Sequence, residues 1–396
     1  MPFRKLFRVL EKTLSTLPFT ENIRDNIIQS ALVILRDLKD ELGLQSARIY
    51  EKIGNKYKII ETLGESKENL KGFSLPANYY PIEQTLENGI SVMDLSTPGV
   101  NIAVEKALGI SQFAAISIAD GQFLIGFSFK EGAEKEEIFQ GLNLLRHTIN
   151  FRLREEQTKK IISEAKKIQE SILPRKNPIF NGFDIYGASF PAEVVGGDYY
   201  DFIWVSDNIL GLSIADATGH GLPAALQVRD VYMGLRMGST REFKITQTME
   251  RLNRLVNREK LTSRFISLFY GELENNGVLI YINAGHNPPV LLKKRKIEYL
   301  KEGGPVLGPL PDAKYQRGVT KIEPKDILIL YTDGIIESKN LEGKEFGLDR
   351  MINIAKKHSR ASSERIAKQI LKAEMEWRSN NPQEDDITLV VIKRNK

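Results

Sequence analysis

The segment that decides the fold of this chain is VVGGDYYDFIWVSDNILGLSIADATGHG, residues 194–221. Two apolar, β-favouring runs flank the turn at Ser206-Asp207-Asn208, and this pattern predicts a hairpin. Centring the hairpin on Asp207 places Val205 opposite Ile209, Phe202 opposite Leu212 and Asp198 opposite Asp216, although a bulge at the turn would slip this register by one. Opposed Cβ atoms lie about 5 Å apart, where two like charges are destabilising. The pair therefore either holds a cation or consists of two solvated strand-end aspartates, and these residues alone leave both interpretations open.

Two later segments favour the cation. DILILYTDGIIES (326–338) runs an apolar strand into Asp333, and QEDDITLVVIK (383–393) places Asp385 just before another apolar strand. If these two strands are antiparallel neighbours, the end of one and the start of the other share a rim. Asp198, Asp216, Asp333 and Asp385 would then form an all-oxygen cluster, which suits Mg²⁺ or Mn²⁺ rather than Zn²⁺. Two such ions about 3.5–4 Å apart would acidify a bridging water to hydroxide for phosphoryl transfer.

Length and composition exclude several classes of protein. A chain of 396 residues predicts two domains joined by a linker. Its 56 Lys and Arg against 51 Asp and Glu leave a net charge of +5, too weak a surplus to indicate a nucleic-acid partner. The absence of cysteine excludes disulfides, thiolate metal sites and cysteine nucleophiles. No apolar run reaches the roughly 20 residues of a spanning helix, and no secretory signal is recognised. We therefore expect a soluble, cytoplasmic protein.

The N-terminal part of the chain divides into two regions. Residues 1–19 predict a basic amphipathic helix, for which packing on its own domain or a dimer partner is favoured over contact with a membrane. Residues 20–153 predict a small α+β domain. We expect a helix over 23–44 and strand pairs at 47–51 with 56–63 and at 113–118 with 122–129, which turn at Gly54-Asn55 and Asp120-Gly121. Nothing in this domain indicates catalysis.

A long helix is predicted over 135–173, ending before Pro174, and residues 154–174 of it are interpreted as a coiled-coil linker. Ile161, Ala165, Ile168 and Ile172 follow the 4-3-4 spacing of a coiled-coil seam. An exposed apolar seam is best buried against its copy, so the linker predicts a parallel homodimer. We expect a change in this helix to reach the helix that begins at Pro223, directly after Asp216.

Residues 175–396 predict a third region of short strands separated by polar, glycine-rich turns. The expected strands are 184–190, 199–205, 209–215, 265–272, 278–283, 327–331 and 387–392, and the expected helices are 223–237, 246–257, 348–357 and 362–377. Many antiparallel strands with a few long helices predict two packed sheets with helices outside them.

Residues 168–396 resemble the metal-dependent (PPM) serine/threonine protein phosphatases, in their bacterial sporulation and stress-response branch. The motifs that carry the resemblance occur in order as IQESILP, FPAEVVGGDYYD, SIADATGHGLPAALQ, NAGHNPPVLL, GGPVLGPL, ILYTDGIIES, EGKEFG and EDDITLVVI. The resemblance implies an α-β-β-α sandwich of two antiparallel sheets flanked by helices, α+β in class. Residues 20–153 resemble a GAF-type sensor domain in element order only, and such a domain would bind an unknown small ligand or protein, or would only dimerise.

The resemblance also implies roles for individual residues. Asp198 and Asp216 would bridge two Mn²⁺ or Mg²⁺ ions beside the backbone carbonyl of Ala217, and Asp333 and Asp385 would complete the second metal site. Asp386 stands where the family often has asparagine, and its role is left open. This branch lacks the general-acid histidine of the eukaryotic enzymes, so His220 is not expected to be an acid, and His286 is expected to be structural.

The function that follows is a phosphoserine/phosphothreonine protein phosphatase regulated by an N-terminal sensor domain. The implied substrate is a phosphorylated anti-sigma-factor antagonist, which would make the protein a signalling enzyme. The alternative is a catalytically silent scaffold of the same fold that binds a signalling partner. A hydrolase of small phosphoesters would share the mechanism and differ only in its substrate. The intact set of four aspartates favours an enzyme, since a silent relative has no need to keep it.

Overall fold

The computed structural model describes residues 22–39, 42–64, 70–130, 132–219, 221–239, 244–258 and 265–395. The expected helix over residues 1–19 and His220 lie outside these ranges. The chain forms two compact units, Met1–Lys160 and Ile161–Lys396. Among the described residues, no helix combines the length and the apolarity that a membrane crossing requires.

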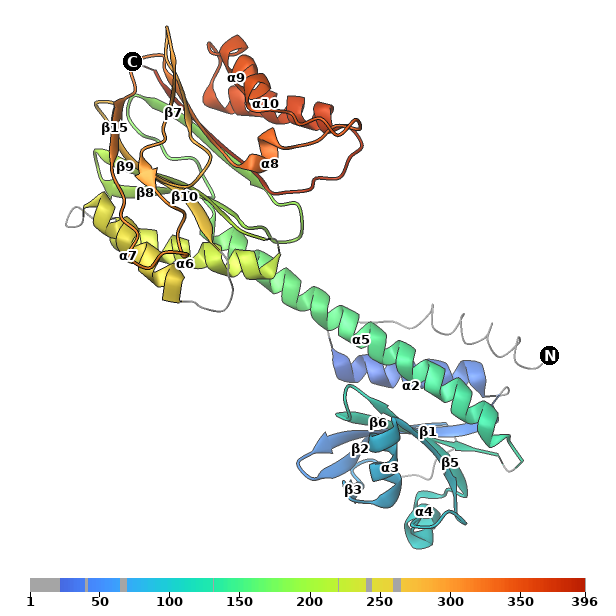
Figure 1. The fold of residues 1–396 in the computed structure, drawn as a ribbon. Helices are drawn as coiled ribbons and strands as arrows, with labels where there is room; N and C mark the ends of the chain where they lie inside the picture. The colour runs from blue at the N-terminus through green and yellow to red at the C-terminus, as the bar shows by residue number, and fades with distance from the viewer. Residues whose placement is uncertain are drawn as a thin grey trace. The chain divides into compact units, whose positions relative to one another are not determined.

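The N-terminal unit is built on one antiparallel sheet of six strands in the order β3-β2-β1-β6-β5-β4 (Figure 1). The strands are β1 (Leu44–Ile53), β2 (Lys56–Gly64), β3 (Ser74–Pro76), β4 (Ile90–Asp94), β5 (Gln112–Ile118) and β6 (Phe123–Phe129). One face packs against α2 (Ile23–Leu38) and the first half of α5 (Lys135–Ile172). The other face packs against α3 (Tyr80–Asn88) and α4 (Ile102–Leu108).

The helix expected over 23–44 is shorter than its apolar spacing suggested. It ends at Leu38, and Leu44 already opens β1. Gly43 adopts the left-handed region with φ +62°, which a helix cannot continue through. Leu42 and Leu44 are buried in the same core as the helix, so their spacing imitates another helical turn. The short elements β3, α3, β4 and α4 carried no periodic signal long enough to be predicted.

Helix α5 extends without interruption from Lys135 to Ile172, as its pattern predicts, and stops before Pro174. The expected seam is wrong at its last position. Ile172 is buried in the core of the C-terminal unit, whereas Ile161 and Ile168 are 57% and 55% exposed. The end of the helix is therefore part of the C-terminal fold, and only the earlier positions present an apolar surface.

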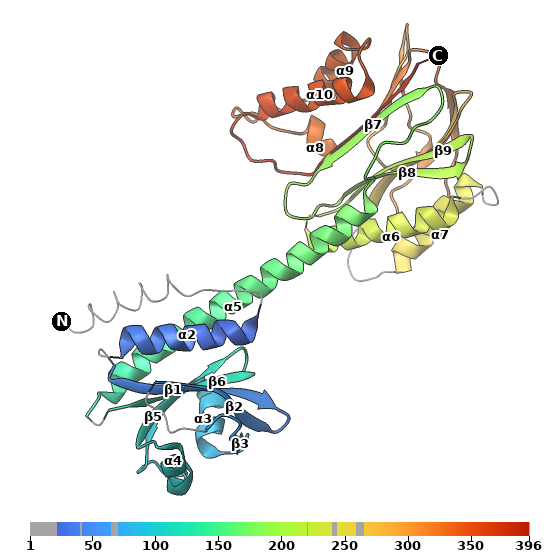
Figure 2. The same cartoon turned by 180° about the vertical axis from the view of Figure 1, so that it is seen from behind.

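The C-terminal unit is a four-layer sandwich of two sheets between helices (Figures 1 and 2). The first sheet contains β8 (Asp198–Ser206), β9 (Ile209–Ala217), β10 (Ile266–Glu274), β11 (Val278–Ala284), β14 (Gly303–Gly304) and β15 (Gly318–Lys321), and it packs on α6 (Leu222–Gly238) and α7 (Ile245–Arg258). The second contains β7 (Phe183–Phe190), β12 (Val290–Leu292), β13 (Ile297–Tyr299), β16 (Ile327–Tyr331) and β17 (Ile387–Arg394), and it packs on α8 (Asp333–Ile336), α9 (Leu348–Lys357) and α10 (Ser363–Arg378). The predicted α+β sandwich is confirmed.

An apolar core lies between the two sheets and buries every second side chain of the central strands. Phe202 and Leu212 of the first sheet pack there with Leu330 and Val390 of the second. Each of these strands points its other side chains toward a helix layer, so both of its faces are buried. Such strands read as nearly continuous apolar runs, which is how the sequence revealed them.

Candidate metal centre

The decisive hairpin forms in the predicted register. Asp198 pairs with Asp216 and Phe202 with Leu212 across β8 and β9. The predicted pairing of Val205 with Ile209 is wrong, because a bulge after Trp204 places Ser206 opposite Ile209. The irregularity stays beside the turn, where a bulge commonly adds one residue to one strand of a hairpin. The two carboxyl groups at the far end of the ladder therefore lie side by side, on the face that lines the space between the sheets.

Burial makes this pair of carboxyl groups costly to ionise. Asp198 is 3% exposed, and its pKa is raised well above its usual range, first by burial and then by Asp216, against hydrogen bonds from Thr388 and Thr332. Burial also raises the pKa of Asp216 to about 7, with further contributions from Asp333, Asp385 and Asp386. Asp333 and Asp385 must lie near Asp216 to raise its pKa in this way, and Asp198 is paired with Asp216, so the four aspartates lie near one another. Two carboxylates in such a place favour a cation between them.

Asp333 and Asp385 reach this rim from the second sheet. β16 and β17 are antiparallel, with Tyr331 opposite Leu389, so Asp333 follows one strand where Asp385 precedes the other. Asp333 is the first residue of α8, and burial, followed by the charge of Glu337, raises its pKa. The aspartates at this end of the sandwich therefore come from the ends of two strands of each sheet, β8 and β9 of the first and β16 and β17 of the second.

The donor set at this rim fits hard divalent cations. Asp198, Asp216 and Asp333 form no ion pair with any Lys or Arg in the described ranges, so their charge is uncompensated by the protein there. The carbonyl oxygen of Ala217 lies close to Gly197, where an added Cβ would come within 2.7 Å of it. However, no three His, Asp or Glu side chains of the described residues are grouped closely enough to hold one ion as they stand. The residues therefore suit Mg²⁺ or Mn²⁺, with side-chain adjustment needed to close a coordination shell.

Asp386 has a different task from its neighbour Asp385. Its carboxylate accepts hydrogen bonds from the backbone N–H groups of Ala192 at 2.7 Å, Gly197 at 2.5 Å and Asp198 at 3.3 Å. At Gly196 an added Cβ would lie 2.2 Å from the Asp386 Oδ2 atom, so glycine is required there. Asp386 thus holds the loop that leads into Asp198 by its backbone. The sequence left this role open, because backbone acceptors leave no motif.

Two further positioning residues were not predicted. The Thr332 hydroxyl donates to Asp198 Oδ2 at 2.7 Å and accepts from the Thr388 N–H at 2.9 Å, which fixes the carboxylate from the second sheet. Gln169, near the end of α5, donates from Nε2 to the Gly196 carbonyl at 2.6 Å and accepts the Gly196 N–H at 3.0 Å. Thr332 lies within ILYTDGIIES and Gln169 within IQESILP, so the sequence pointed to both segments without showing their contacts.

His286 is buried beside this site, as a structural residue would be. Its Nδ1 atom lies 2.7 Å from the Ser267 hydroxyl, and its backbone N–H donates to Asn283 Oδ1 at 2.7 Å. Ser267 faces Asp216 across the β9–β10 ladder. Burial lowers the pKa of His286 to about 4, so the imidazole is neutral at pH 7. Because so little of its imidazolium form exists at pH 7, His286 is a poor general acid there.

A pocket of about 250 Å³ opens next to the acidic rim. Asp385 and Gly334 form one side of it, and Lys339, Arg378 and Glu384 line the rest. Lys339 and Glu384 form an exposed ion pair of 3.3 Å, which solvent and ligands can exchange readily. The pocket provides room for groups of a substrate beside the carboxylates.

The chain is similar to a family of known proteins. Residues 206–395 match the family model described as Stage II sporulation protein E (SpoIIE). Protein IcfG from Synechocystis is 28% identical over 270 residues, covering 59% of this chain and 41% of that protein. Phosphoserine phosphatase RsbU from Bacillus subtilis is 28% identical over 245 residues, covering 61% of this chain and 72% of that protein.

Two further proteins are also similar to this chain. Phosphoserine phosphatase RsbP from Bacillus subtilis is 26% identical and covers 46% of each chain. The chain thus spans less than half the length of IcfG and of RsbP. Among solved structures, the SiaA-PP2C domain of Pseudomonas aeruginosa superposes with a TM-score of 0.53 at 19% identity, covering 61% of this chain and 98% of that one. This likeness shows a shared fold.

Proposed function

The C-terminal domain belongs to the SpoIIE family, and from this premise we propose that the chain is a metal-dependent phosphatase acting on phosphoserine or phosphothreonine in a protein. The observation that carries the proposal is the buried pair Asp198 and Asp216, with Asp333 and Asp385 acting on it from the second sheet. With both carboxylates ionised, such an arrangement is costly unless cations neutralise it. The relatives RsbU and RsbP are named phosphoserine phosphatases, which supports this choice of reaction.

In this proposal Asp198 and Asp216 hold two Mn²⁺ or Mg²⁺ ions together with the Ala217 carbonyl, and Asp333 and Asp385 complete the second site. When bound, the ions would supply Lewis-acid activation of water and of the phosphoryl group. The protein contributes the geometry: Thr332 fixes the Asp198 carboxylate, while Asp386 and Gln169 fix the backbone that precedes it. Lys339 lies at the adjoining pocket, where a cation favours the phosphate-bearing part of a substrate.

We propose a phosphorylated anti-sigma-factor antagonist as the substrate and the N-terminal unit as a regulatory domain. Support for the substrate comes from the family context alone. Support for regulation comes from Gln169. This residue lies near the end of α5, and its side chain binds the backbone of Gly196, two residues before Asp198. Through the exposed positions Ile161 and Ile168, the same helix would pair with a second copy in a parallel homodimer.

The test is phosphate release from candidate phosphoproteins, measured with Mn²⁺ and again with excess chelator. The proposal requires release that chelator abolishes and added Mn²⁺ restores. Release that persists in chelator would contradict a metal-dependent mechanism. A parallel measurement with a small phosphoester separates protein from small-molecule specificity, since only the protein substrate can contact the surface around the rim.

A silent scaffold is the second candidate, favoured by one observation. In the described residues no three acidic or histidine side chains are grouped tightly enough to hold an ion. A scaffold would bind the phosphoprotein without turning it over and would take up Mn²⁺ weakly. Titration calorimetry with Mn²⁺ distinguishes the two, because the phosphatase requires two bound ions per chain and the scaffold requires none.

A further inference from the structure

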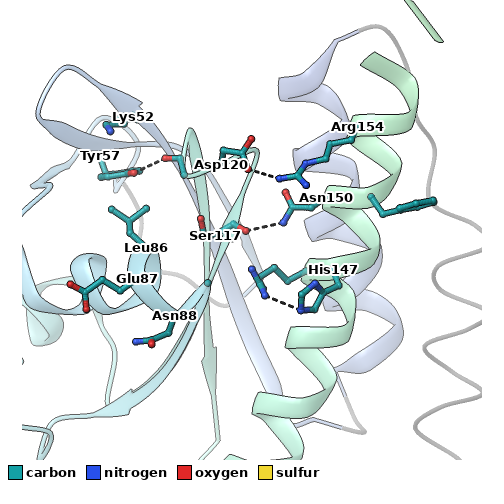
Figure 3. A pocket seen from close by; sticks show the side chains of 14 residues that line it. Lys52, Tyr57, Leu86, Glu87, Asn88, Ser117, Asp120, His147, Asn150 and Arg154 are labelled. Atoms are coloured by element: carbon teal, nitrogen blue, oxygen red, sulfur yellow. Dashed lines mark hydrogen bonds and ion pairs between the residues drawn. The ribbon is translucent and has the colours of Figure 1, made fainter. Parts of the chain in front are cut away.

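The N-terminal unit contains a cleft of about 980 Å³, which lies within the size range of small-molecule sites. Figure 3 shows its walls: α5 with His147, Asn150 and Arg154 on one side, and the end of α3 with Leu86, Glu87 and Asn88 on the other. The turn between β5 and β6 closes one end. The cleft lies wholly within residues 52–154, so it is formed by this unit alone.

The turn that closes the cleft is held in a costly conformation. Ala119 and Asp120 both have φ +51°, and Gly121 follows at +82°. Left-handed backbone at a non-glycine residue costs on the order of 1–3 kcal/mol and persists only where the surroundings enforce it. Here Asn150 accepts the Ala119 N–H at 2.8 Å and donates to the Ser117 carbonyl at 3.1 Å, while the Tyr57 hydroxyl donates to the Gly121 carbonyl at 2.5 Å. The wall of the cleft is therefore rigid and formed in advance.

The cations of the cleft are only partly neutralised. Within the described residues neither Lys52 nor Arg146 forms an ion pair. The Arg146 guanidinium instead donates to the uncharged amide oxygen Asn143 Oδ1 at 3.1 Å and lies 2.9 Å from His147 Nε2. Arg154 binds Asp120 at 2.7 Å, but the two side chains are 70% and 82% exposed, so this pair is weak and exchangeable.

Room for the guanidinium is built into α3. Gly89 ends this helix with φ +78°, and an added Cβ would lie 2.2 Å from Arg146 Nη1. The end of a helix favours a cation, which accounts for part of the stabilisation of Arg146. Among the residues that the structure describes, the other donors of this guanidinium and the Lys52 ammonium have no acidic partner on the wall of the cleft. Two acidic side chains, Glu87 and Asp120, line the cleft against three basic ones, Lys52, Arg146 and Arg154.

We propose that this cleft binds a small organic anion through a phosphate or carboxylate group, with Arg146 and Lys52 as its anchors. A guanidinium with free donors suits planar, two-point recognition of an oxyanion. Asn150 and Tyr57 serve as positioning residues, because they hold the turn that forms the wall. This inference does not depend on the proposed phosphatase activity.

The test is isothermal titration of the full chain with inorganic phosphate, AMP, citrate and adenosine, after bound metal has been stripped with a chelator and the chelator removed by dialysis, so that the acidic rim holds no metal-bound anion and no chelator competes for the cleft. We expect at least one anion to bind and the neutral adenosine not to bind. Arg146→Gln should weaken the binding by about tenfold or more, because charge-assisted hydrogen bonds are lost. Arg146→Lys should recover part of the affinity, since it keeps the charge without the two-point geometry.

Lys52→Gln and Lys56→Gln form a matched pair for this test. Each removes one exposed lysine of the same hairpin that forms no ion pair with any described residue, but only Lys52 lines the cleft. Because the Lys52 side chain is exposed, its variant keeps the test valid if Arg146→Gln destabilises the fold. Binding weakened by Lys52→Gln and unchanged by Lys56→Gln supports the site. No binding of any anion at millimolar concentration, or equal losses in both variants, would overturn it.

Discussion

Asp198 and Asp333 are the residues on which the proposed activity depends most directly. Replacing either by asparagine removes a charge that offsets a dication, while the side chain keeps its size. We expect the Mn²⁺-dependent rate of phosphate release to fall by more than the roughly 10- to 100-fold that loss of an outer-shell partner costs. Asp207→Asn, at the exposed turn of the same hairpin, is the matched control and should retain full activity. Undiminished turnover in a folded Asp198→Asn protein would contradict the metal site.

The raised pKa of Asp216 predicts how the metal-free protein responds to pH. The folded-state value of about 7 exceeds the ordinary value of 3.8 that applies to an unfolded chain. The stabilisation from this group is thus complete below the unfolded pKa and is lost as the pH rises through 7. In chelator, the Tm of the native protein should fall relative to that of Asp216→Asn between about pH 4 and pH 7. Saturating Mn²⁺ should reduce the difference, and parallel curves without metal would refute the assignment.

At the scale of elements, the features that depend on local sequence patterns could be predicted, and those that depend on contacts between distant segments could not. The hairpin register, β16 and α9 follow from local periodicity and turn chemistry, and the structure confirms them. The ends of the strands beside Asp333 and Asp385 could be read locally, whereas the pairing of these two strands was an assumption, which the structure confirms. The roles of Asp386 and Gln169 could not be read, because both bind backbone atoms of a loop distant in sequence. Ile172 was misassigned because an apolar seam and a buried core have the same spacing.

Helix α5 offers an element-level prediction through Gln169. This side chain is 8% exposed and makes two hydrogen bonds to the backbone of Gly196, so Gln169→Ala leaves both backbone groups without their partner. We expect Mn²⁺ affinity to fall by roughly 10- to 100-fold, as for other outer-shell contacts. Gln157→Ala, at an exposed position of the same helix, should change nothing. Calorimetric titration with Mn²⁺ checks both, and equal affinities in the two variants would remove Gln169 from the site.

At the scale of the whole molecule, the proposed homodimer depends on exposed apolar residues of α5. Ile161 and Ile168 are seven residues apart and more than half exposed, an arrangement that a second helix would bury. We expect the protein to be dimeric at micromolar concentration and Ile161→Asp to shift it toward monomer. Ser163→Asp introduces the same charge at an exposed position outside the seam and should leave the dimer intact. Light scattering coupled to size exclusion measures both, and a monomeric native protein would contradict the proposal.

The last prediction concerns regulation through α5. In a continuous helix, a rotation at one end changes the direction in which every later side chain points. Each residue of an α-helix turns it by about 100°, so one residue inserted near Glu164 rotates Gln169 relative to everything before the insertion. Seven inserted residues nearly restore the phase. We expect signal-dependent control of phosphate release to be lost with the single insertion and largely retained with the heptad, while both proteins keep the basal rate that the C-terminal unit sets. The comparison needs both insertions, since a flexible tether would tolerate either one equally. If stimulated and basal rates are unchanged in both, α5 joins the two units without coupling them.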